Sequence, residues 1–207
     1  MTVPPYVITV RRRFVNLWDP HPSQITLGDI EHALSNQVRW SGHTPEFYSI
    51  AEHSVNVALF IESHTEAIGT SPLNVPLLAL HGLMHDAHEA YIGDISAPLE
   101  DLIAGSSEIP TAIDDIKDRL QACILKTLNI TPLLRGSVGE QIVAEADKKA
   151  WALEAIHFFG DSAQDFLPKK YWDLPRYFNI EYKNPGAARS SFRETYKRLR
   201  NEPDINE

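Results

Sequence analysis

The stretch at residues 79–94 constrains the fold most, because it sets histidines and acids inside an apolar segment. On a helix, His81, His85, His88 and Glu89 would fall at i, i+4, i+7 and i+8, so all four would share one face. A buried face that carries imidazoles and carboxylates must bind a metal, form ion pairs or hold water, because burying a bare charge is costly. The pattern therefore predicts a functional site on a helix that ends at Gly93.

Helical patterns also dominate the rest of the chain. Capping patterns at residues 26–29, 49–52 and 137–140 predict three helix starts, and apolar spacing predicts helices over 113–128 and 187–200. Residues 6–17 instead alternate β-branched and aromatic side chains, which favours a short β-hairpin or an extended arm. The expected fold class is all-α, a bundle of about six or more helices.

The length of 207 residues, 43% of them hydrophobic, favours a single domain. We divide it into an N-terminal arm (1–24), a core (25–160) and an aromatic, basic extension (161–207) that packs on the core. Nine of the nineteen Lys and Arg residues lie between positions 169 and 200. They favour a solvated helix that covers the core, and a dimer or phosphate-recruiting surface is the alternative.

Charge and cysteine content restrict the partners and the compartment. The formal net charge of −9 argues against a nucleic-acid polymer as partner, because phosphate backbones need a basic surface. The single cysteine, Cys123, lies in a helical run and is expected to be a small buried side chain. No apolar run approaches the roughly 20 residues of a membrane span. We expect a cytoplasmic protein, and a homodimer stays open.

Four residues form the candidate metal site: His53, the adjacent pair His85 and Asp86, and Asp147. Their separations of 32 and 61 residues are tertiary, so spacing alone cannot establish the set. The pattern resembles the HD-domain phosphohydrolase superfamily, which has a lone His, a His-Asp pair and a final Asp on a later helix. The resemblance implies that these four residues are ligands.

The surrounding residues sharpen this resemblance. Three short motifs look like those of the 5′-deoxynucleotidase-like branch of the superfamily. They are Arg39-Trp40, Glu52-His53-Ser54, and His85-Asp-Ala-His-Glu89 followed by Gly93-Asp94. Members with two metals generally place extra histidines between the His-Asp pair and the final Asp. Here only His88 lies in that interval, so the resemblance favours one divalent ion per chain. Its ligands, two imidazoles and two carboxylates, suit Zn, Mn, Co, Ni or Fe.

The resemblance also implies roles for the neighbouring residues. Glu89 would orient or deprotonate the attacking water and Asp94 would protonate the leaving group, although these two roles could be exchanged. Arg39 is our candidate for binding the phosphate through two hydrogen bonds. Trp40 would exclude a 2′-hydroxyl, and the alternative is an ordinary packed aromatic. His43 is either a loop cap or a phosphate contact.

Two further histidines of the opening stretch, His81 and His88, match no ligand of the superfamily. Each is expected to lie at the edge of the core or to orient a ligand.

The leading functional interpretation is hydrolysis of a small nucleotide, a 2′-deoxynucleoside 5′-monophosphate, by attack of a metal-bound water. The first alternative is a triphosphohydrolase that releases triphosphate from deoxynucleoside triphosphates with the same ligands. The second alternative is a regulatory HD module that binds a nucleotide without turnover. An oxygenase is disfavoured, because such HD proteins use two irons and the intervening histidines are missing.

Overall fold

A computed structural model describes residues 5–63, 75–106, 111–174 and 179–201, and this part of the chain is mainly helical, as the sequence predicts. The α-helices in chain order are α1 (Leu27–Asn36), α2 (Ile50–Ser63), α3 (Val75–Met84), α4 (Glu89–Ile92), α5 (Ala97–Ser106), α6 (Ala112–Thr127), α7 (Val138–Phe159) and α8 (Pro185–Arg200). Four short 3-10 helices are also present in the described residues: η1 (Pro22–Gln24), η2 (Trp40–Gly42), η3 (Gly160–Asp165) and η4 (Lys169–Tyr171).

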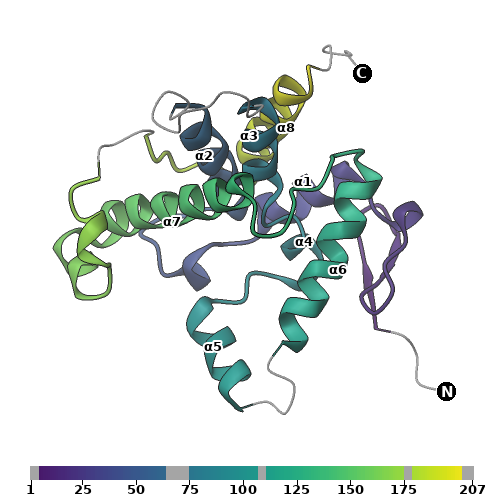
Figure 1. The fold of residues 1–207 in the computed structure, drawn as a ribbon, viewed down its shortest axis with the longest axis horizontal. Helices are drawn as coiled ribbons and strands as arrows, with labels where there is room; N and C mark the ends of the chain where they lie inside the picture. The colour runs from purple at the N-terminus through teal and green to yellow at the C-terminus, as the bar shows by residue number, and fades with distance from the viewer. Residues whose placement is uncertain (1–4, 64–74, 107–110, 175–178, 202–207) are drawn as a thin grey trace.

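Helices α2, α3 and α7 form the centre of the fold. Figure 1 shows α7 lying across α2 and α3, while α5 and α6 extend to its other side. Gly82 lets α3 approach α2 closely, because a Cβ there would lie 2.7 Å from Ile61 Cδ1 and 3.2 Å from Val57 Cγ1. This close approach brings the side chains of α2 and α3 together above α7.

Side-chain caps start the helices where the sequence predicts them. The Ser49 hydroxyl accepts the backbone N–H of Glu52 (3.2 Å), and the Glu52 carboxylate accepts that of Ser49 (2.9 Å). Thr26 caps α1 and Ser137 caps α7, each by accepting the N–H three residues later. In the α7 cap the Glu140 carboxylate accepts the backbone N–H of Gly136, whereas a capping box would have it accept that of Ser137.

The predicted N-terminal hairpin is present. Strands β1 (Tyr6–Ile8) and β2 (Phe14–Asn16) pair antiparallel, with Val7 opposite Val15. Val15 is fully buried and joins the main core, where Cys123 is also buried as expected.

One expectation is wrong: residues 79–94 do not form one continuous helix. Helix α3 ends at Met84, residues 85–88 form tight turns with i to i+3 hydrogen bonds, and α4 follows. Two helix carbonyls are taken by side chains, that of Gly82 by His85 Nδ1 (2.8 Å) and that of Met84 by Gln121 Nε2 (2.7 Å). The Met84 carbonyl also accepts the backbone N–H of Ala87 (3.1 Å), which is an i to i+3 bond, so the α-helical hydrogen-bond pattern changes to tight turns there. The four polar residues therefore do not share one helix face.

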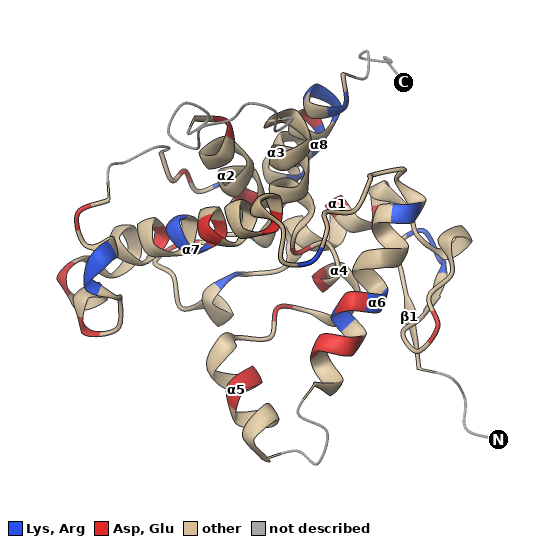
Figure 2. Ribbon diagram, in the orientation of Figure 1, with Lys and Arg blue, Asp and Glu red and all other residues tan. Residues whose placement is uncertain are grey.

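The basic helix α8 packs on the core. Its residues Ala188, Phe192, Tyr196 and Leu199 are buried in the main hydrophobic cluster. Arg189 and Arg193 bind the fully buried carboxylate of Glu31 on α1, and Arg198 pairs with Glu62 on α2. Figure 2 shows basic residues in its last turn. These ion pairs support the reading of α8 as a helix that covers the core.

Within the described residues, none of the helices is both long and apolar enough to span a membrane.

Candidate metal centre

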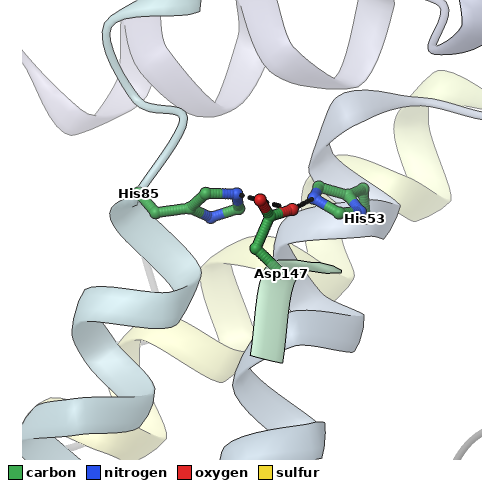
Figure 3. Close-up of side chains that lie close together, drawn as sticks. All are labelled: His53, His85 and Asp147. Carbon is green, nitrogen blue, oxygen red and sulfur yellow. Dashed lines mark hydrogen bonds and ion pairs between the residues drawn. The ribbon is translucent and has the colours of Figure 1, made fainter. Parts of the chain in front are cut away.

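The three central helices bring four predicted ligands together. Figure 3 shows His53 of α2 and His85, just after α3, pointing toward Asp147 of α7. The Nε2 atoms of His53 and His85 lie 3.0 and 3.5 Å from Asp147 Oδ1, and 3.7 and 3.0 Å from Asp86 Oδ2. Neighbouring ligands of an ion with bonds of about 2.1 Å lie about 3.0–3.4 Å apart, so this spacing fits a divalent metal.

The hydrogen bonds of the two rings set their tautomers. His53 Nδ1 lies 2.6 Å from the Glu154 carboxylate and His85 Nδ1 lies 2.8 Å from the Gly82 carbonyl, and both partners can only accept. Each Nδ1 therefore carries a proton, and each Nε2 faces the carboxylates with either a second proton or a lone pair. His85 Nε2 is buried and lies 3.0 Å from Asp86 Oδ2 without hydrogen-bond geometry, as expected for two atoms that bind the same metal.

The two carboxylates of the cluster are stabilised by positive charge beside them. Burial would lower the pKa of His85, but the charges of Asp86 and Asp147 outweigh it and raise this pKa well above its usual value. Burial would raise the pKa of Asp86 and of Asp147, but the two histidines hold both pKa values well below the usual range. The carboxylates are thus ionised, and positive charge between the four groups stabilises them.

A fifth residue, Glu154, connects the ligands to the arginine. It lies two turns beyond Asp147 on α7 and is fully buried. One of its carboxylate oxygens accepts from His53 and the Tyr48 hydroxyl (2.9 Å), and the other accepts from Arg39 Nε (2.9 Å). Burial would raise the pKa of Glu154, but His53 and Arg39 lower it to about 2.

Arg39 lies at the edge of the cluster. Its Nη1 is 3.9 Å from Asp86 Oδ2, and its Nε is held by Glu154. Burial would lower the pKa of Arg39, but Glu154, Asp86 and Asp147 raise it above its usual value, so the guanidinium stays charged. Since Nε is occupied, the terminal nitrogens are the ones available to a phosphate.

Trp40 follows in a left-handed turn. Trp40 and Ser41 have φ values of 58° and 51°, which is unusual for residues with a side chain. The Trp40 indole stacks on Trp151 with ring centroids 6.1 Å apart, and its N–H donates to Glu154 (3.3 Å). These contacts hold the strained turn in place and fix the position of Arg39 beside it.

Glu89 and Asp94 interact electrostatically with the ligand Asp86 and with Arg39. Burial, together with the charges of Asp86 and Asp94, raises the pKa of Glu89 to about 9. Burial also raises the pKa of Asp94, although Arg39 opposes this. Gly93, with φ of 81°, makes the turn between them. Carboxyl groups with raised pKa values next to a cluster of this kind are candidates for proton transfer.

Comparison with known proteins agrees with this geometry. Residues 50–152 match the model of the HD-domain family. The chain is 30% identical over 185 residues to an uncharacterised protein of Rhodobacter capsulatus, and the match covers 87% of this chain and 88% of that one. The chain belongs to the HD-domain family. An uncharacterised protein of Escherichia coli, YfdR, is 35% identical to it over 92 residues, 44% of each chain.

Membership in the HD-domain family indicates a metal-dependent phosphohydrolase, because HD domains bind divalent metals and are generally hydrolases. The matched range includes His53, His85, Asp86 and Asp147. Neither relative's description names a substrate, so the deoxynucleotidase-like branch stays a prediction.

The other three histidines of this HD protein that the sequence analysis names lie in different settings. His81 Nε2 bonds the Thr131 carbonyl (2.9 Å), and burial lowers the pKa of this histidine. His88 is buried beside Asp86 and Glu89. His43 is exposed after η2, and among the described residues no hydrogen bond or ion pair joins its side chain to the cluster. Its predicted phosphate contact therefore stays a prediction.

Sequence reasoning missed two residues that organise the site of this HD protein. Glu154 holds His53 and Arg39, and Gln121 holds the Met84 carbonyl that ends α3. The position of Glu154, seven residues after Asp147 on the same helix, is a signal that could have identified it. Gln121 lies on an amphipathic helix with no comparable signal.

Proposed function

We propose that this protein hydrolyses the phosphate ester of a nucleotide, with a 2′-deoxynucleoside 5′-monophosphate as its substrate. The observation that carries the proposal is the convergence of His53, His85, Asp86 and Asp147 beside the charged Arg39 and the two carboxyl groups of Glu89 and Asp94. A divalent ion held by the four ligands would polarise the phosphoryl group and lower the pKa of a coordinated water to about 7.

The residues of the chain supply the remaining parts of the reaction. The terminal nitrogens of Arg39 bind the phosphate oxygens, and Glu154 fixes the guanidinium by holding Nε. Glu89 and Asp94 move the protons, one for the attacking water and the other for the leaving alkoxide. Trp40, fixed against Trp151, limits the room beside the sugar.

The expected test is the Glu89→Gln variant. General acid–base help is worth about 10²–10⁴-fold, so this variant should release phosphate from deoxynucleotides that much more slowly. The ion held by His53, His85, Asp86 and Asp147 should stay bound, as measured by elemental analysis. Activity close to wild type would refute the role of Glu89.

A further inference from the structure

A second group of potential ligands lies next to the first. Asp86, His88 and Glu89 each offer a ligand atom, and these atoms lie within 4.8 Å of one another. They come from the turn that interrupts the expected helix after α3 and from the first residue of α4. A continuous helix would have placed His88 about 200° around its axis from Asp86, so the turn is what brings His88 to the two carboxylates.

The carboxylate of Glu89 points to an absent partner. Glu89 is only 6% exposed, and its Oε2 atom is buried with no hydrogen-bond partner among the described residues. A buried polar oxygen without a partner is costly, and a divalent ion bound by Asp86 and His88 would supply the partner that this oxygen lacks.

The tautomer of His88 fits a ligand. Gln121 Nε2 donates to the Met84 carbonyl (2.7 Å), which turns the amide oxygen toward His88 Nδ1 (3.4 Å). That oxygen can only accept, so His88 Nδ1 carries the proton and Nε2 keeps its lone pair. A metal-binding histidine is held in this same way, by a hydrogen bond from its other ring nitrogen. His88 is 8% exposed, so its ring has little contact with water.

We propose that Asp86, His88 and Glu89 form a second divalent-cation site that shares Asp86 with the first, in place of the single ion per chain that the sequence favours. It rests on the proposed metal centre, because Asp86 Oδ2 faces His53 and His85 and leaves Oδ1 for the second ion. The ligand set of one imidazole and two carboxylates suits Mn²⁺ or Zn²⁺. Two ions about 3.5–4 Å apart can clamp a phosphoryl group between them. Glu89 has two oxygens, so one can bind the ion while the other faces the attacking water.

The test adds Mn²⁺ to the full-length, metal-free protein without substrate. It measures the number of ions bound per chain and whether their spins are coupled. Wild type should bind two Mn²⁺ per chain, and its electron paramagnetic resonance spectrum should show a spin-coupled pair. His88→Gln should bind one ion and lose the coupling. The matched control is His81→Gln, another buried histidine of the same stretch, which should keep two coupled ions. Glu89→Gln, which should also lose one ion, serves if His88→Gln fails to fold by circular dichroism.

One Mn²⁺ per chain in wild type, two uncoupled ions, or two coupled ions in His88→Gln would each overturn the second site. These readouts do not depend on turnover. Two coupled ions with no hydrolysis of any phosphate ester would instead refute the proposed function and leave the second site standing.

Discussion

The buried carboxylate of Glu154 should contribute both to stability and to metal affinity, and Glu154→Gln tests both. The carboxylate accepts hydrogen bonds from Arg39, Trp40, Tyr48 and His53. An amide of the same shape would turn an NH₂ group toward two of these donors and remove the charge beside Arg39. The variant is therefore a small change in volume and a large change in hydrogen bonding.

The magnitude follows from the pKa of Glu154. Folding lowers this pKa from 4.5 to about 2, because His53 and Arg39 outweigh the effect of burial. The ionised carboxylate then contributes roughly 3 kcal/mol at neutral pH. This contribution is present above pH 4.5 and is lost as the pH falls toward 2. Breaking a buried ion pair costs about 3–5 kcal/mol, so the two figures agree.

We expect Glu154→Gln to lower the free energy of unfolding of the metal-free protein by about 3 kcal/mol in urea titrations. It should also weaken Mn²⁺ binding about 10–100-fold in a chelator competition, because His53 loses the partner of its Nδ1. The matched control is Glu145→Gln on the same helix, whose carboxylate lies 3.7 Å from Lys149 and is 42% exposed. It should change stability by less than about 0.5 kcal/mol. Wild-type Mn²⁺ affinity together with wild-type stability in Glu154→Gln would refute the reasoning.

Two further predictions concern substrate choice and the packing of α8. If Trp40 excludes a 2′-hydroxyl, wild type should prefer dAMP to AMP and Trp40→Ala should lose much of that preference; an equal preference in both proteins, measured as kcat/KM, would remove the idea. Glu31→Gln leaves the guanidinium of Arg189 without its buried partner and should cost about 3 kcal/mol in urea titrations. Glu62→Gln at the exposed pair with Arg198 should cost at most about 1 kcal/mol, and equal losses in the two variants would contradict the account.

The local features of the fold were predictable because they depend on neighbouring residues. Caps such as Ser49 with Glu52 and the alternation in the N-terminal hairpin are interactions over a few positions, and the structure confirms both. The end of α3 at Met84 was not predictable in this way. The side chain that binds the last carbonyl of α3, that of Gln121, lies 37 residues further along the chain.

In the candidate site, too, the features that depend on distant residues were not predictable from local sequence. The spacing of His53 from His85 and Asp86 carries no periodic signal, and a resemblance to a known family was needed to connect them. The spacing of Glu154 from Asp147 places both on one face of α7, but the hydrogen bond of Glu154 to His53 spans 101 residues, so the sequence does not indicate this partner. Residues that hold ligands in place through tertiary contacts are therefore the part of the site that sequence reasoning misses.

The central claim is that this HD protein hydrolyses a nucleotide phosphate ester with a metal held by His53, His85, Asp86 and Asp147. The most direct test is a panel of nucleoside mono- and triphosphates, assayed on chelated and on remetallated protein with identification of the product. We predict inorganic phosphate from deoxynucleoside monophosphates after remetallation, no release after chelation, and none from a remetallated Asp147→Asn variant. Release of triphosphate would replace the proposed reaction with a triphosphohydrolase, and metal binding without turnover of any nucleotide would contradict the claim.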